Sequence, residues 1–181
     1  MFMQLPKRKW EDEYLRMRRW FWRLQPISGG VPNPFSLNTG YQDDIFDAFF
    51  KTCYHLKDWL KNAGVPDVED YIKKSEYLSL CDAICNYNKH AGLDVNAKKP
   101  MRDPDTSTNT LLLLNKDAGW FNLFIINHPT KTYTNAISVA ARCINEWNIF
   151  LTNKNLAIPE LLEEQSHLAF TGLKLEDYFD D

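Results

Sequence analysis

The stretch QDDIFDAFFKTCYHLKDWLKN, residues 42–62, decides the fold that this sequence predicts. Its apolar residues recur every three or four positions, which is the spacing of one face of an α-helix. They are Ile45, Phe49, Cys53, Leu56 and Leu60. Asp43 and Asp44 in the first turn and Lys61 in the last turn suit the helix dipole, and Gly64 follows where the pattern ends. We therefore expect a long amphipathic helix here.

A second helix is expected in EYLSLCDAICNYNKHA, residues 76–91. Ser75 precedes it as a cap, and Gly92 ends it. Its inward side comprises Tyr77, Leu78, Cys81, Ile84, Cys85 and Asn88. A short helix over 67–74, with Asp67 as its cap, joins the two helices. Because so short a connection favours antiparallel neighbours, we expect this pair to form the centre of the molecule.

The rest of the chain completes a mainly α (α+β) fold, which is a helical bundle with an inserted β-hairpin. The hairpin is expected at about 110–127, with strands over 111–114 and 120–126 joined by a turn rich in Asn, Asp and Gly. A third strand would begin at Thr132–Tyr133. We expect loops over 25–40 and 93–109, and further helices over 7–24, 135–152 and 159–168.

The length of 181 residues suits one domain. We expect this single helical domain to span 41–170. Residues 1–25 are predicted to form an amphipathic, basic and aromatic helix, which the following loop sets apart as an appendage. Residues 171–181 are predicted to form an acidic tail. A chain of this size buries roughly 70% of its unfolded surface, so it needs no disulfide or metal for stability.

Charge is distributed unevenly along the chain. The net charge of −3 argues against general nucleic-acid binding by the whole molecule. Residues 1–25, however, hold seven basic against three acidic residues, and residues 160–181 hold seven acidic residues against Lys174 alone. The two ends could pack together or be solvated. Alternatively, the first helix binds RNA, DNA, an acidic membrane surface or a protein partner. Its candidate binding residues are Arg16, Arg18, Arg19, Arg23, Trp10, Trp20 and Trp22.

The cysteines indicate a reducing compartment. They are Cys53, Cys81, Cys85 and Cys143. Most lie in apolar helical stripes and none belongs to a CxxC pair, so the simplest interpretation is buried, reduced thiols. The sequence shows no secretory signal and no apolar run near the ~20 residues of a membrane span, so we expect a cytoplasmic protein. With no P-loop, GxGxxG or HExxH motif, we expect no cofactor and no metal.

The helix pair also carries polar residues that could perform chemistry. The candidate catalytic residues are His90, Asn86, Lys89, His55, Asp58 and Asp82. On each helix most of them lie three or four positions apart, so antiparallel packing would bring the two groups together. A His moves protons, a carboxylate orients it, and an amide or ammonium group stabilises phosphate charge. This set suits metal-independent RNA cleavage by the 2′-OH. Two His and two Asp could instead bind a divalent metal, or the His residues could simply hydrogen-bond across the helix pair.

The segments FFKTCYHLKDWL (49–60) and LCDAICNYNKH (80–90) resemble a pattern of small uncharacterised bacterial and phage helical proteins. In that pattern a helix with YHLKDW is followed by a helix that contains Cys-Asp and ends in Lys-His, then by a β-hairpin and a final helix with Trp. The resemblance covers about residues 42–152. It implies the same order of elements in this chain.

The second segment is also similar to the HEPN-type helical domains of toxins and defence nucleases, which usually act as dimers on RNA. This resemblance implies that His90 is catalytic and that Asn86 is its polar partner. The helix lacks the Arg of the motif and has a shorter spacing, so phosphate stabilisation would fall to Lys89 or to an arginine from elsewhere. Many HEPN-like domains lack the motif and act in binding or assembly.

These resemblances lead us to expect a small module of a bacterial or phage defence or toxin-type system that binds protein or RNA. Its partner would be a second copy in a homodimer, another protein, or RNA. The alternatives are an HEPN-like endoribonuclease centred on His90 and a domain with a structural role only.

Overall fold

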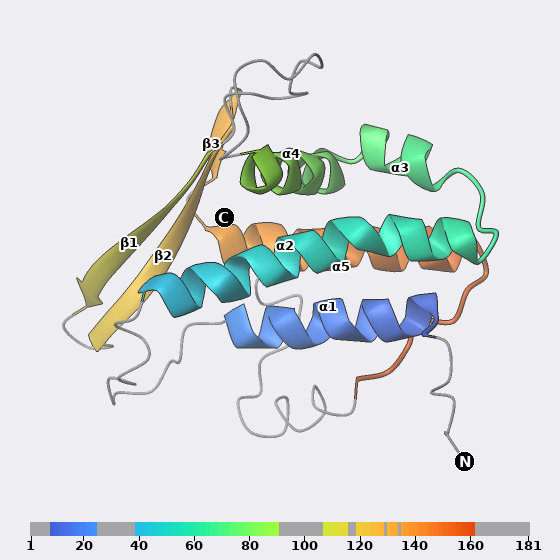
Figure 1. Ribbon diagram of the computed structural model, residues 1–181, viewed down its shortest axis with the longest axis horizontal. Helices are drawn as coiled ribbons and strands as arrows, with labels where there is room; N and C mark the ends of the chain where they lie inside the picture. Colours follow the sequence, from blue (N-terminus) through green and yellow to red (C-terminus); the bar gives the residue numbers. More distant parts are fainter. Residues whose placement is uncertain are drawn as a thin grey trace.

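The computed structural model describes residues 8–24, 39–90, 107–115, 119–128, 130–133 and 135–161 (Figure 1). Side chains are described over 8–24, 43–85, 125–128, 130–133 and 135–161. The elements in chain order are α1 (Trp10–Leu24), α2 (Thr39–Asn62), α3 (Val68–Lys74), α4 (Glu76–His90), β1 (Ser107–Asn115), β2 (Gly119–His128), β3 (Lys131–Tyr133) and α5 (Ala136–Asn153).

The helices form the body of the molecule, and the sheet lies at one end of it (Figure 1). α2 is central: it packs against α1 on one side and against α4 on the other, while α5 contacts α1, α2 and α4. The mainly helical fold with an inserted β-hairpin is therefore confirmed. Within the described residues, no helix combines the length and the apolar character that crossing a bilayer requires.

The predicted helix pair supplies much of the core. All residues of the predicted stripe on α2 are buried, and Phe49, Cys53, Leu56 and Leu60 are fully inaccessible to solvent. The pair is joined by α3, as expected, and the Ser75 hydroxyl caps α4 by accepting the backbone N–H of Leu78 at 3.1 Å. This bond satisfies one of the amide groups that the first turn of a helix leaves without an intrahelical partner.

α1 is a layer of this core. Trp10, Tyr14, Met17, Phe21 and Leu24, the predicted apolar stripe, are all buried, and they belong to the same apolar cluster as the core residues of α2, α4 and α5. The helix begins at Trp10, where the backbone N–H of Lys9 donates to Asp12 at 2.8 Å. We expected residues 1–25 to form an appendage. Their described part, residues 8–24, is instead integrated into the domain.

The sheet has the order β1-β2-β3 with antiparallel pairing throughout. β1 pairs with β2 from Ser107↔Asn127 to Asn115↔Gly119, and β3 pairs with the end of β2 through Ile126↔Tyr133. β1 begins inside the predicted 93–109 loop, so that expected loop boundary is wrong. The polar residues at its start lack a clear strand pattern, but pairing with the apolar end of β2 extends the ladder over them.

Two other predicted boundaries also differ from the structure. α2 begins at Thr39, inside the expected 25–40 loop. The helix expected over 159–168 is not formed at Pro159–Leu161, and 162–168 lie outside the described residues. α5 ends at Asn153. Asn155 then takes a positive φ of 56°, and the N–H of Leu156 bonds back to Leu151 O at 2.9 Å. Pro159 permits a first helical turn but does not require one.

Candidate nucleic-acid interface

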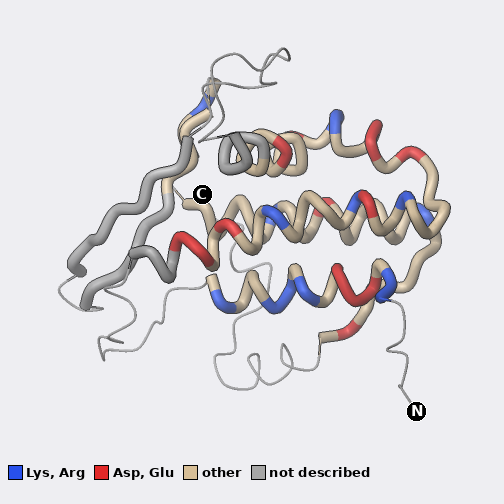
Figure 2. Tube along the Cα trace, viewed as in Figure 1, with Lys and Arg blue, Asp and Glu red and all other residues tan. Residues whose placement is uncertain are grey.

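The outward face of α1, together with the two residues before it, forms a groove of about 780 Å³ that we call the basic groove. Its lining contains five cations, two carboxylates and one indole: Arg8, Lys9, Asp12, Glu13, Arg16, Arg19, Trp20 and Arg23. These residues recur with the helical period on the side opposite the buried stripe. Figure 2 shows Lys and Arg spaced along α1, with the acidic residues gathered near its N-terminal end.

Both carboxylates of the basic groove already have partners. Asp12 accepts the N–H of Lys9, and the Glu13 carboxylate, whose side chain is only 7% exposed, lies 3.6 Å from the Arg16 guanidinium. The acidic groups therefore offset the cations near the start of the helix and leave the far end positive. There the Arg23 guanidinium lies 4.8 Å from the ring centroid of Trp20, a cation–π contact that holds both side chains at the groove.

The structure removes two predicted residues, Trp10 and Arg18, from this binding surface. Trp10 is a core residue at 9% exposure. Arg18, at 7% exposure, points inward and donates to the hydroxyl of Tyr14 at 2.8 Å. Trp10 and Arg18 are therefore closed to a large ligand, and that part of the prediction is corrected. Trp22 is half-buried, as Trp20 is: its ring packs edge-on against Phe21, with the ring centroids 5.0 Å apart, and both indoles pack against the core. Trp22 stays a predicted binding residue, although it does not line the basic groove.

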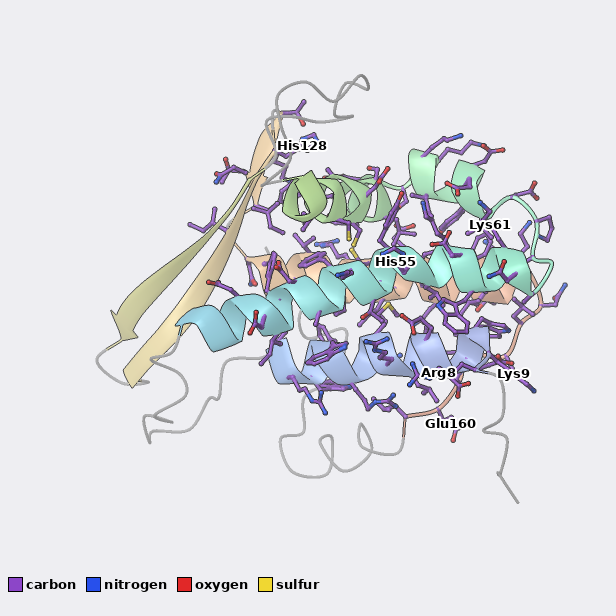
Figure 3. The ribbon with its side chains drawn as sticks, viewed as in Figure 1. Arg8, Lys9, His55, Lys61, His128 and Glu160 are labelled. Carbon is purple, nitrogen blue, oxygen red and sulfur yellow. The ribbon has the colours of Figure 1, made fainter. Side chains whose placement is uncertain are left out.

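The binding set predicted from the sequence omits Arg8 and Lys9, although both line the basic groove. Figure 3 labels them at the N-terminal end of α1. The sequence does hold a signal for Arg8, because this residue lies two helical turns before Arg16 and continues the same face. Lys9 has the same signal, since it also lies about two helical turns before Arg16 and falls on the same face.

A second groove, of about 530 Å³, lies between α1 and α2 and shares Glu13 and Arg16 with the basic groove. We call it the His55 groove. Its remaining lining comprises Asp44, Asp47, Ala48, Lys51, Thr52, His55, Asp58 and Trp59. Nδ1 of His55 lies 3.2 Å from the Asp58 carboxylate, and each of these side chains is 49% exposed. The predicted His55–Asp58 pair is therefore formed, and it is open to solvent beside α1.

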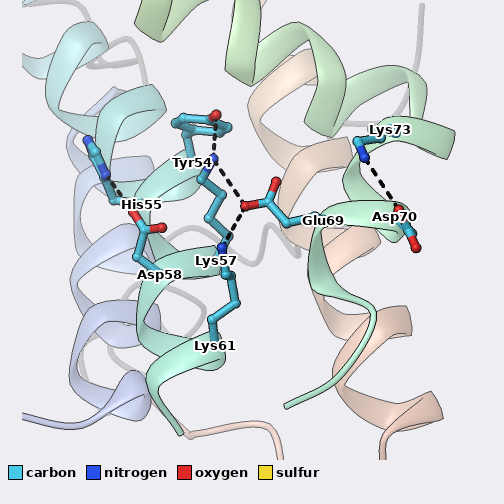
Figure 4. A network of polar contacts seen from close by, with 8 residues as sticks. All are labelled: Tyr54, His55, Lys57, Asp58, Lys61, Glu69, Asp70 and Lys73. Atoms are coloured by element: carbon cyan, nitrogen blue, oxygen red, sulfur yellow. Dashed lines mark hydrogen bonds and ion pairs between the residues drawn. The ribbon is translucent and has the colours of Figure 1, made fainter. Parts of the chain in front are cut away.

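Asp82 belongs to α4 and lies where that helix packs against α2, outside the His55 groove. Burial, followed by a hydrogen bond to the Asp82 carboxylate, raises the pKa of Tyr54. The same hydroxyl accepts a hydrogen bond from Lys57, whose ammonium group lies 3.7 Å from Glu69 on α3 (Figure 4). This network ties α2 to α3 and α4, so Asp82 takes part in a structural link and does not join His55 and Asp58 as predicted.

The remaining predicted catalytic residues are Asn86, Lys89 and His90. The backbone of all three is helical in α4, but their side chains lie outside the described residues. The expectation that His90 is catalytic therefore stays a prediction. What the structure does show is that the described members of the predicted set lie on two different sides of α2.

Three thiols meet where α2, α4 and α5 pack together. Sγ of Cys81 lies 3.5 Å from Sγ of Cys53 and 3.5 Å from Sγ of Cys143, and all three side chains are fully buried. Burial raises the pKa of the Cys81 and Cys143 thiols. At Cys53 the same burial is outweighed by hydrogen bonds from the other two thiols, which lower its pKa. We call this set the thiol cluster.

Metal binding by His and Asp has no geometric support in the part of the chain that the structure describes. There, the thiol cluster is the one group of His, Cys, Asp or Glu side chains close enough to share an ion. No family model, no curated protein and no solved structure matches the chain.

Proposed function

We propose that this protein is a nucleic-acid-binding module and that its basic groove holds the phosphate backbone of single-stranded RNA. The observation that carries the proposal is the composition of the groove, in which five cations and the half-buried indole of Trp20 line one face of α1 and the two residues before it. Proteins that bind single strands combine a positively charged groove, which follows the backbone, with aromatic rings on which bases stack.

The arrangement along α1 supports a backbone ligand. Neighbouring cations three or four residues apart on a helix are about 5–6 Å apart at their Cβ atoms, so they can engage several phosphates of one strand. Trp20 adds a stacking surface, and its partner Arg23 can contact a phosphate or a base. Because the net charge of the whole chain is −3, this attraction is local to the groove.

The position of His55 supports a second function, RNA cleavage. The His55 groove shares Glu13 and Arg16 with the basic groove, so a strand held on α1 would lie near an exposed imidazole paired with Asp58. Such a pair can accept the proton of a 2′-OH. If the protein cuts RNA, His55→Ala should abolish cleavage and leave binding unchanged. Cleavage that is lost only in His90→Ala would favour the HEPN-like alternative.

The wider setting remains a proposal. A bacterial or phage defence or toxin-type system and a homodimeric assembly are what the resemblances imply. RNA binding by the basic groove requires neither of them.

The proposal is tested by measuring the affinity for a labelled, short single-stranded RNA by fluorescence anisotropy at several salt concentrations. The double variant Arg19→Ala/Arg23→Ala should bind more weakly. Its slope of log affinity against log salt should be shallower by about 0.7 for each phosphate that the variant no longer neutralises.

The matched control is Lys61→Ala/Lys73→Ala, which removes the same charge from exposed side chains of α2 and α3 outside the basic groove. It should retain the slope of the wild type. An equal loss of affinity in both double variants would mean that only the net charge matters, and it would contradict a defined interface.

A further inference from the structure

The thiol cluster has no part in the proposed RNA interface, and its geometry suits a metal ion. Its three sulfur atoms lie within 4.8 Å of one another and come from three different helices. An ion about 2.3 Å from each of three sulfurs in one plane holds those sulfurs about 4.0 Å apart. Two of the three sulfur–sulfur distances are 3.5 Å, and the third is at most 4.8 Å. These distances lie on either side of 4.0 Å, so an ion fits with small shifts of the side chains.

We propose that Cys53, Cys81 and Cys143 form a buried, three-coordinate site for a soft monovalent cation, Cu⁺. Thiolate ligands select soft ions. Zn²⁺ prefers four ligands in a tetrahedron, and in the described part of the chain the cluster has three sulfurs and no fourth His, Cys, Asp or Glu side chain. The polar groups beside it are backbone carbonyls: Tyr77 O accepts from Cys143 at 3.4 Å, and Cys53 O accepts from the indole N–H of Trp147 at 3.2 Å. Three sulfur ligands are enough for Cu⁺.

The selection of Cu⁺ rests on soft ligands and on their number, because charge works against loading the site. Burying an uncompensated charge in an apolar core is costly. Cysteines that bind a metal do so as thiolates, so three of them around Cu⁺ leave a net charge of −2 in the buried site. When the site is loaded, the three thiol protons are displaced and leave to solvent, and the copper does not change oxidation state.

The experiment uses the full chain, reduced and kept anaerobic, with Cu⁺ as the probe and a coloured Cu⁺ chelator as the competitor. Because the sulfurs are fully buried, the ion is added both to the folded protein and during refolding. The wild type should retain one Cu⁺ per chain. Cys81→Ala should lose more affinity than the roughly 10–100-fold that follows when a residue that only orients a metal ligand is removed.

Cys85→Ser is the matched control, because this thiol donates to Phe50 O at 3.4 Å and lies outside the thiol cluster. It should retain Cu⁺ as the wild type does. Circular dichroism shows whether each variant is folded. If Cys81→Ala does not fold, X-ray absorption at the copper edge of the loaded wild type decides the question. Sulfur neighbours alone would support the site.

Three results would overturn the inference. The first is nitrogen or oxygen neighbours around the copper. The second is a Cys81→Ala variant that retains Cu⁺ as tightly as the wild type does. The third is a reduced wild type that holds Cu⁺ no better than its unfolded chain, which would leave the cluster as core packing. The inference is independent of RNA binding, so neither test decides the other.

Discussion

Tyr71 links two helices through a single hydroxyl, and its ionisation predicts how stability depends on pH. The hydroxyl donates to the Glu146 carboxylate at 2.9 Å. Burial, followed by this bond, raises the pKa of Tyr71 above the usual value of about 10. A raised pKa in the folded state contributes stability that is present below the unfolded pKa and is lost as the pH rises through the folded one.

We therefore expect the urea midpoint of the wild type to fall as the pH is raised above about 10. Tyr71→Phe should be less stable near neutral pH, because Glu146 loses its donor, and its midpoint should fall less over the alkaline range. Urea unfolding followed by circular dichroism at a series of pH values measures both effects. An alkaline loss that is identical in the variant would contradict the role of Tyr71.

Single residues also show where prediction from the sequence reaches its limit. Arg18 and Arg19 are adjacent and chemically identical, yet Arg18 is buried against Tyr14 whereas Arg19 lines the basic groove. Neighbours on a helix differ by about 100° in direction. The apolar stripe locates the buried face correctly, but it cannot show that a second helix covers the edge on which Arg18 lies.

Capping gives a prediction at the scale of one element. The Ser75 hydroxyl accepts the N–H of Leu78 at the start of α4. Ser75→Ala should destabilise the protein by about 1 kcal/mol, the typical effect of losing such a cap. Ser79→Ala is the matched control, because that hydroxyl is exposed and only donates to Glu76 O. Urea midpoints compare the two variants. A loss as large in Ser79→Ala would rule out the cap as the cause.

Elements are predictable where a periodic pattern and its end signals agree. α3, α4 and α5 begin and end within about two residues of their predicted bounds, and Ser75 caps the start of α4 as predicted. Asp67 precedes α3 as predicted, but its side chain forms no cap bond. β1 is not predictable in this way, since its first residues are polar and its ladder depends on pairing with β2. Local propensity carries no information about a partner strand that lies ten or more residues away.

The contribution of α1 is a property of the whole molecule. Tyr14, Met17, Phe21 and Leu24 are each no more than 1% exposed. At about 1.5–3 kcal/mol for each buried side chain, the four contribute roughly 6–12 kcal/mol, which is comparable with the total stability of a domain. A chain that lacks residues 1–25 should therefore lose cooperative unfolding, as urea denaturation would show.

The matched comparison is Arg19→Ala/Arg23→Ala, which keeps the buried stripe and should unfold as cooperatively as the wild type. A truncated chain with the midpoint of the full protein would mean that α1 is a separable appendage. This contrast also separates the two roles of α1, because its inner face stabilises the core while its outer face carries the proposed interface.

The overall arrangement explains why the candidate site is only partly predictable. The sequence pattern of α2 separates its apolar face from its polar face correctly. Which face meets α4 and which meets α1, however, depends on the docking of α1. The pair of His55 and Asp58 faces α1, while Asp82 faces Tyr54. Helix spacing alone cannot decide between two possible neighbours.

The most direct test of the central claim is to locate bound RNA on the protein. A short single-stranded RNA with photoreactive uridines is cross-linked to the wild type, and the attached peptides are identified by mass spectrometry. We predict cross-links within residues 8–23, with Trp20 among them, and their loss in Arg19→Ala/Arg23→Ala. Cross-links confined to α3, α5 or the sheet, unchanged in that variant, would contradict the assignment of the basic groove as the RNA interface.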